Sequence, residues 1–407
     1  MKNLQRKIAA AIAGSALVMQ MVPAVALASV SCTISGNGSD TDNNCNFASL
    51  QEVTVEQDNN LDVDNQVDVE SNTGGNTAED NTGGNVEVTT GKASVDVAVD
   101  TNGNTNAANV ANTNSNGDYD LTVSGNGTNS DNNVDLDVTD KVTVKQDNKA
   151  DVDNKVDVEA STGKNEANDN TGGNVVIDTG DVVVESVKVS NALNVNSATV
   201  GDDRDSGVLS AWISDNGSDT DNKIDLALLS EVEVDQENDA DVENDVWVDG
   251  VTGKNEGEDN TGGDSEVTTG DVTVDVTVDT MANFNQADVS GTSMGEVELK
   301  IKENGTDSDN TLDLDLTDAL DVDQDNDFDA DSDVDVEGKT GDNELEDNTL
   351  GEGGDDPSID TGASDTSVSV STSGNANVFG GDMDLQLDFD MSELVNLLNA
   401  LGALLGL

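Results

Sequence analysis

Histidine is absent from this chain, and proline, cysteine and aromatic residues are scarce: 407 residues include two prolines, two cysteines and 2% aromatics. Without histidine, neither a Ser-His-Asp or Cys-His catalytic arrangement nor the common His-containing zinc sites can form. So few aromatics also leave little surface on which sugars could stack, and no carboxylate pair stands out from the many present. We therefore expect that the protein is not an enzyme.

Positive charge is lacking as well. The chain has 16 lysines and arginines against 86 aspartates and glutamates, which gives a formal net charge of −70. This charge excludes nucleic acids and anionic lipid surfaces as electrostatic partners and favours cations. High charge with few aromatics is also typical of disordered chains, but such chains do not need the strict patterning found here.

Long apolar runs are rare, and the first lies at the N-terminus. The segment 1–28 reads "MKNLQRKIAAAIAGSALVMQMVPAVALA", a basic start, an apolar stretch and a small-residue end. It is typical of a signal peptide cleaved after Ala28, and its removal would take the net charge from −70 to −73. No later stretch reaches the roughly 18 consecutive apolar residues of a membrane span. We expect a secreted or cell-surface protein without a transmembrane span.

A long repeat organises the rest of the chain. "NGSDTDNNC" begins at Asn37 and returns as "NGTNSDNNV" at Asn126, "NGSDTDNKI" at Asn216 and "NGTDSDNTL" at Asn304, at spacings of 89, 90 and 88 residues. Asn-Gly is a favoured pair in tight turns. The pattern predicts repeats at 29–120, 121–209, 210–298 and 299–381, followed by a different tail at 382–407.

Between the turns the sequence alternates with period two, as in β-strands with one buried and one acidic face. Amides such as Gln57 and Asn59 lie on the apolar side, where an unpaired amide would cost about 1 to 3 kcal/mol. Stacked coils would let these amides bond to one another. Asparagines recur about every 22 residues, and the predicted structural amide ladder comprises Asn37, Asn59, Asn81, Asn126, Asn148, Asn170, Asn216, Asn238, Asn260, Asn304, Asn326 and Asn348.

Two all-β folds fit this pattern. The first is a β-solenoid of about 22-residue coils, grouped in four repeats of about 89 residues, with a short C-terminal helix. The alternative is four tandem β-sandwich domains, because about 89 residues is close to the size of an immunoglobulin-like domain. The 22-residue sub-period and the inward amides favour the solenoid.

The two cysteines, Cys32 and Cys45, flank the first turn of an exported chain, so we expect a disulfide between them. The later repeats have apolar residues at both positions. The bridge would therefore staple the N-terminal end of the stack.

Aspartates in the recurring "D-x-D-N" loops are candidate metal ligands, because alternate residues of a tight turn can direct several oxygens at one ion. The candidates are Asp40, Asp42, Asp131, Asp219, Asp221, Asp307 and Asp309. Two interpretations stay open: specific calcium binding, or turns on an acidic surface where cations act only by screening. Calcium is the one cofactor that the sequence suggests.

The tail contains "MSELVNLLNALGALLGL", whose apolar residues follow a helical period after Ser392 as N-cap. Such a helix could cap the stack, or it could serve self-association or peripheral membrane contact.

A 22-residue strand-turn-strand repeat, with lines such as "VKQDNKADV" in which Gln146, Asn148 and Ala150 alternate, resembles the curlin repeat of bacterial amyloid fibres. The resemblance implies a β-solenoid subunit that stacks into a fibre through glutamine and asparagine ladders. The chain also looks like the acidic Asn/Asp-rich exported repeat proteins of ultrasmall bacteria. We expect a structural or adhesive protein of the cell surface or extracellular matrix, fibre-forming and stabilised by cations, whose partners are its own copies or other surface proteins. The alternative is a calcium-binding adhesin built of sandwich domains.

Overall fold

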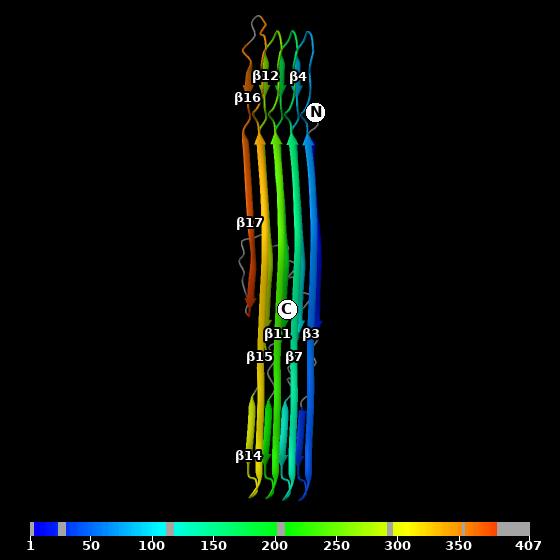
Figure 1. Ribbon diagram of the computed structural model, residues 1–407, viewed down its shortest axis with the longest axis vertical. Helices are drawn as coiled ribbons and strands as arrows, with labels where there is room; N and C mark the ends of the chain where they lie inside the picture. Colours follow the sequence, from blue (N-terminus) through cyan, green and yellow to red (C-terminus); the bar gives the residue numbers. More distant parts are fainter. Residues whose placement is uncertain are drawn as a thin grey trace.

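The computed structural model describes residues 4–22, 30–110, 118–201, 208–290, 296–351 and 355–380, the first range as backbone only. Every regular element in these ranges is a strand, and the strands run along the long axis of a rod (Figure 1). The predicted all-β class is therefore confirmed. The predicted helix in 382–407 lies outside the described residues. Within the described ranges no helix is present that could cross a membrane.

Each repeat folds as one flattened coil. The first coil contains β2 (Val30–Ser35), β3 (Asp42–Asn72), β4 (Val86–Thr89) and β5 (Ala93–Val110). The same elements return in coil 2 as β6 (Tyr119–Ser124), β7 (Asp131–Ser161), β8 (Val175–Asp178) and β9 (Val182–Val200), and in coil 3 as β10 (Leu209–Ser214), β11 (Asp221–Val251), β12 (Ser265–Thr268) and β13 (Val272–Val289). Coil 4 contains β14 (Val297–Lys302), β15 (Asp309–Lys339), β16 (Ser358–Asp360) and β17 (Ser364–Phe379).

The coils stack through parallel sheets that each take one strand from every repeat. The sheet orders are β15-β11-β7-β3, β14-β10-β6-β2, β16-β12-β8-β4 and β1-β5-β9-β13-β17. Because the repeats share all of these sheets, they do not form separate sandwich domains. The tandem-sandwich alternative is wrong for this structure.

The stacking register shows that one coil is one whole long repeat. Asp131 lies opposite Asp42, Asp221 opposite Asp131 and Asp309 opposite Asp221, which are steps of 89, 90 and 88 residues. The expected coil of about 22 residues is therefore wrong. A coil that short needs a corner every few residues, but β3 contains no glycine or proline and continues through Asn59 for 31 residues.

The core lies between the sheet of long strands and the sheets that face it. Its largest cluster is almost entirely valine and joins β3, β7 and β11 to β5, β9 and β13. Along β11, residues alternate between the buried core face and an outer face rich in acids. Valine suits this position because its β-branched side chain packs well on a pleated surface.

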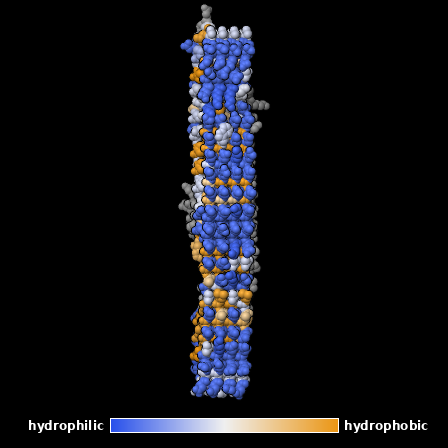
Figure 2. Space-filling view, viewed as in Figure 1, coloured by the Kyte–Doolittle hydropathy of each residue, from blue (hydrophilic) through white to orange (hydrophobic). Residues whose placement is uncertain are grey.

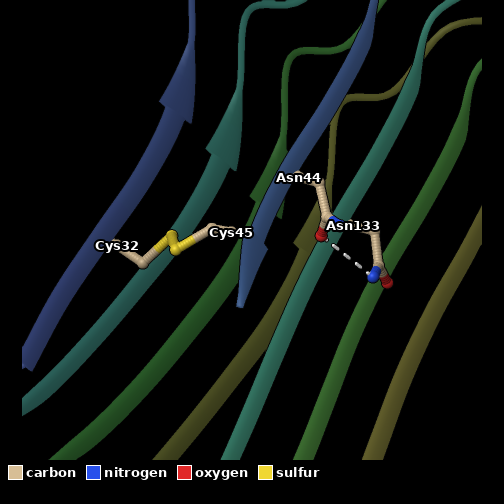
Figure 3. Close-up of a disulfide and its surroundings, with 4 residues drawn as sticks. All are labelled: Cys32, Asn44, Cys45 and Asn133. Carbon is tan, nitrogen blue, oxygen red and sulfur yellow. Dashed lines mark hydrogen bonds between the residues drawn. A yellow bond between two sulfur atoms is a disulfide. The ribbon is translucent and has the colours of Figure 1, made fainter. Parts of the chain in front are cut away.

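The predicted disulfide is confirmed. Cys32 of β2 and Cys45 of β3 are bridged across the two layers, with a Cα–Cα distance of 6.6 Å (Figure 3). In the neighbouring coil Leu121 and Val134 occupy the equivalent positions. The bridge therefore replaces an apolar contact and ties the two sides of coil 1 together at one end of the stack.

The segment Leu4–Val22, which belongs to the predicted signal peptide, forms strand β1. It pairs in parallel with β5 along its whole length, from Leu4 opposite Ala93 to Val22 opposite Val110. In the folded chain that retains this segment, β1 thus covers the outer edge of β5.

Candidate functional site

The recurring loop is the corner between the short and the long strand of each coil. Its fourth residue adopts a left-handed conformation, with φ between 56° and 60°, in all four copies: Asp40, Asn129, Asp219 and Asp307. Asp and Asn tolerate this conformation better than most residues. The hydroxyl that follows donates to the carbonyl of the corner glycine at 2.8 to 3.2 Å. The loop's composition is therefore explained by turn geometry.

The corner glycines are required because adjacent coils approach closely there. A Cβ on Gly127 would lie 2.5 Å from the carbonyl carbon of Gly38, and one on Gly217 would lie 2.7 Å from that of Gly127. Gly38, at the end of the stack, has no atom within 4 Å of such a Cβ. The stacked backbone thus explains why glycine recurs after the corner asparagine.

The structure lines up the predicted metal ligands in two columns along the stack. One column contains Asp40, Asp219 and Asp307, with Asn129 between them; the other contains Asp42, Asp131, Asp221 and Asp309, which face one another in register. All seven predicted ligands are exposed. One contact between neighbouring corners is a hydrogen bond of 2.6 Å from Asn129 Nδ2 to Asp40 Oδ1.

The closest group of three carboxylates in the described ranges lies elsewhere. Oxygens of Glu258, Glu344 and Glu346 are within 4.8 Å of one another, in the turn-rich segments that follow β11 and β15. A hydrogen bond with Glu346 raises the pKa of Glu344, and burial raises the pKa of Glu258. Carboxylate oxygens are ligands that calcium accepts. The sequence pattern did not single out this group because its members come from different repeats.

The twelve predicted amides form three ladders, each crossing all four coils. Asn37, Asn126, Asn216 and Asn304 make up the corner ladder, in which every amide nitrogen donates to the next Oδ1 at 2.9 to 3.0 Å. The ladder of Asn59, Asn148, Asn238 and Asn326 lies inside the core, and that of Asn81, Asn170, Asn260 and Asn348 lies beyond the long strands. Each step is one long repeat.

A further amide ladder escaped the sequence interpretation. Asn106, Asn196, Asn285 and Asn377 stack on the facing layer and also bond across the core to the Asn59 ladder, for example Asn148 Nδ2 to Asn196 Oδ1 at 2.7 Å. The signal was present as an N-x-N pattern, since an asparagine occurs two residues earlier in each copy. Two bonded amide ladders therefore fill the middle of the core.

The outer face of the long strands is largely hydrophilic, in regular rows with narrower hydrophobic rows between them (Figure 2). Between β11 and β15, seven consecutive outward positions pair acid with acid, from Glu233 opposite Asp321 to Asp245 opposite Asp333. Between β7 and β11, lysines of coil 2 relieve this repulsion, as in the pairs Lys141–Glu231 at 3.1 Å and Lys149–Asp239 at 3.1 Å. These pairs lie at the surface and are at least partly accessible to water, so each contributes little to stability.

The crowding of acids appears in their pKa values. The charge of Asp147 raises the pKa of Glu237, while burial and then the neighbouring Asp58 raise the pKa of Asp147. Burial also raises the pKa of Asp157 and Asp249. At these four positions the folded chain favours protons, and where neighbouring acids contribute, as at Glu237 and Asp147, it also favours cations.

These raised pKa values predict an unusual pH dependence of stability. A carboxyl whose folded pKa is raised stabilises the fold fully below its unfolded pKa, near 4, and this contribution is lost as pH rises through the folded pKa. We expect a higher melting temperature near about pH 4 than near about pH 8, measured by circular dichroism at constant ionic strength. Salt at about 0.5 M should reduce the difference. A melting temperature that rises steadily with pH would contradict this prediction.

Comparison with protein-family models, curated proteins and solved structures gives no match. The geometry of the stack is therefore the main basis for a function. That geometry provides stacked amide ladders, an acidic array with the coil spacing, and two ends of the stack that differ from each other.

Proposed function

We propose that the protein is an exported structural component of the cell surface or extracellular matrix, whose copies assemble end to end and are stabilised by cations. The observation that supports this most is the open end of the stack at coil 4. Ile301 of β14 is 48% exposed, whereas Ile213, its equivalent in coil 3, is completely buried. Val370 of β17 is 47% exposed, whereas its equivalent Val278 is completely buried.

A second copy is a suitable cover for this end. Coil 1 has the same order of strands and the same corner as the other three coils. Coil 1 of a second copy could therefore follow coil 4 and extend every sheet by one strand. An uncovered edge of long strands is otherwise prone to unspecific pairing. With β15 about 100 Å long and two layers about 10 Å apart, the end face would bury well over the roughly 800 Å² per partner of a standard interface.

In such an assembly the stacking register would bring carboxylates of two copies opposite one another, and cations would offset their repulsion. Continuing the stack from β15 to β3 of the next copy would place Asp325 opposite Asp58 and Asp329 opposite Asp62, because these residues occupy the same columns. Each such pair at coil spacing repels by about 1 kcal/mol even at the dielectric of water. Calcium, a hard cation that bridges carboxylates, would turn this repulsion into attraction.

Negative-stain microscopy of the exported chain tests this function. In millimolar calcium we expect filaments with the thickness of a single stack. With a chelator at low ionic strength we expect short rods, because the acid pairs at the contact between two copies then repel each other with no cation between them. Magnesium and sodium at matched ionic strength are the controls. Equal assembly in all three salts would reduce the role of calcium to screening, and monodisperse rods under every condition would contradict end-to-end assembly.

A further inference from the structure

Strand β1 lies where the last strand of another copy would dock. Inside the stack, each strand of this sheet pairs with its equivalent one coil away, in the order β5-β9-β13-β17. β1 continues this series beyond β5 with the same parallel direction. It therefore occupies the position that a β17 from a second copy would take if the stack continued.

The two ends of one core column show what β1 covers. Val97 of β5 pairs with β1 and is 1% exposed, while Val368, the member of the same column in β17, is 49% exposed. Among the residues that the structure describes, coil 1 is thus closed on this side and coil 4 is open. Val97 and Val368 are equivalent residues of one column, so the difference in their exposure is due to one additional strand, β1.

An unsatisfied amide marks the place where β1 is an imperfect substitute. Asn104, Asn194, Asn283 and Asn375 occupy equivalent left-handed positions, and along this ladder each Nδ2 donates to the next Oδ1. Asn104 begins the ladder; it is 1% exposed, and its Oδ1 has no hydrogen-bond partner. Its missing donor is the Nδ2 of an asparagine one coil earlier.

Strand β1 differs at this place from the strands inside the stack, and it has no asparagine there. Two residues of β1, between Gly14 and Leu17, lie opposite the single residue Asn104 of β5, whereas β5 and β9 keep one register past Asn104 and Asn194. The two residues of β1 are Ser15-Ala16, so the segment offers no side-chain amide. β17 has the asparagine and passes this place without a register shift: Asn375 is in the left-handed conformation and is exposed.

We propose that Leu4–Val22 is a removable cap on the docking edge for a second copy of this chain. When the N-terminal segment is removed, β17 of the second copy pairs with β5 and the Nδ2 of its Asn375 donates to Asn104 Oδ1. This inference rests on the end-to-end assembly proposed above and adds a means of controlling it. The chain that retains Leu4–Val22 remains a single stack. Removal of this segment permits filaments to grow in one direction.

The test uses the full-length chain with a site-specific protease sequence inserted after Ala28, so that the cap is released from a folded protein. In calcium, we expect light scattering and microscopy to show single stacks before cleavage and filaments after it. Adding a synthetic peptide of residues 4–22 during cleavage should slow growth, and a scrambled peptide of the same composition should not. Asn375→Ala in the cleaved chain should slow growth about tenfold, the equivalent of one lost hydrogen bond to Asn104. The substitution also removes the Oδ1 to which Asn283 Nδ2 donates, so growth is compared at a temperature well below the melting temperature of either chain.

The outcomes separate this inference from the proposed function. Filaments that grow equally well before and after cleavage would overturn the cap while leaving end-to-end assembly in place. Single stacks both before and after cleavage would overturn end-to-end assembly, and the docking edge with it. Growth that is unaffected by the peptide would show that the β5 edge is not the joint.

Discussion

Replacing Asn196 with alanine is expected to destabilise the protein by about 4 kcal/mol, which lowers the melting temperature of a chain of this size by about 5 °C. Its Oδ1 accepts hydrogen bonds from Asn106 at 3.0 Å and Asn148 at 2.7 Å, and its Nδ2 donates to Asn285 at 3.0 Å. All of these groups are buried, so each partner would lose one of its hydrogen bonds in a region that water does not reach.

Asn377→Ala is the matched control, because Asn377 ends the same ladder at the exposed face of coil 4. Water can replace its contacts, so we expect a loss below about 1 kcal/mol. Thermal melting and hydrogen exchange of β9 would measure both variants. Equal effects of the two substitutions would show that the buried ladder does not stabilise the stack.

Gly217→Ala is expected to separate coils 2 and 3 at their corner. The added Cβ would lie 2.7 Å from the carbonyl carbon of Gly127 and 2.7 Å from the amide nitrogen of Thr128. Both atoms belong to backbone held by sheet pairing, so the clash cannot be relieved by a side-chain rotation. We expect a loss of at least about 3 kcal/mol and faster hydrogen exchange at the corners.

Gly38→Ala provides the comparison within the same motif, since a Cβ there meets no atom within 4 Å. We expect its melting temperature to match that of the unmodified chain. If Gly38→Ala were as damaging as Gly217→Ala, the glycine would be needed for turn conformation and not for the approach of stacked backbones.

Much of the architecture could be predicted from residue spacing. The 89-residue repeat, the strand alternation and the inward position of Gln57 and Asn59 all return in the structure, because period two and a buried amide have few solutions in a β fold. The disulfide was predictable for a similar reason: both cysteines replace apolar residues that flank one turn.

The length of one coil was not predictable from the asparagine series. Asn59 and Asn81 are 22 residues apart, yet neither bonds to the other; Asn59 bonds to Asn148 above it and to Asn106 across the core. A periodic series of asparagines shows that a residue type recurs at a fixed spacing. It does not show whether the residues contact each other within one coil or between neighbouring coils. The absence of glycine and proline between 42 and 72 was the stronger signal.

The sequence by itself determined that the chain is all-β and built of four equivalent repeats, with amides inside and acids outside, because alternation and repeat length are local properties. Only the tertiary structure decided which amides bond, which carboxylates approach one another and how the two ends differ. Glu258 and Glu344 meet because coils lie in register, and Asn104 lacks a donor because no earlier coil precedes it. These contacts join residues about 90 positions apart, so they depend on the stacking register, which no local pattern encodes.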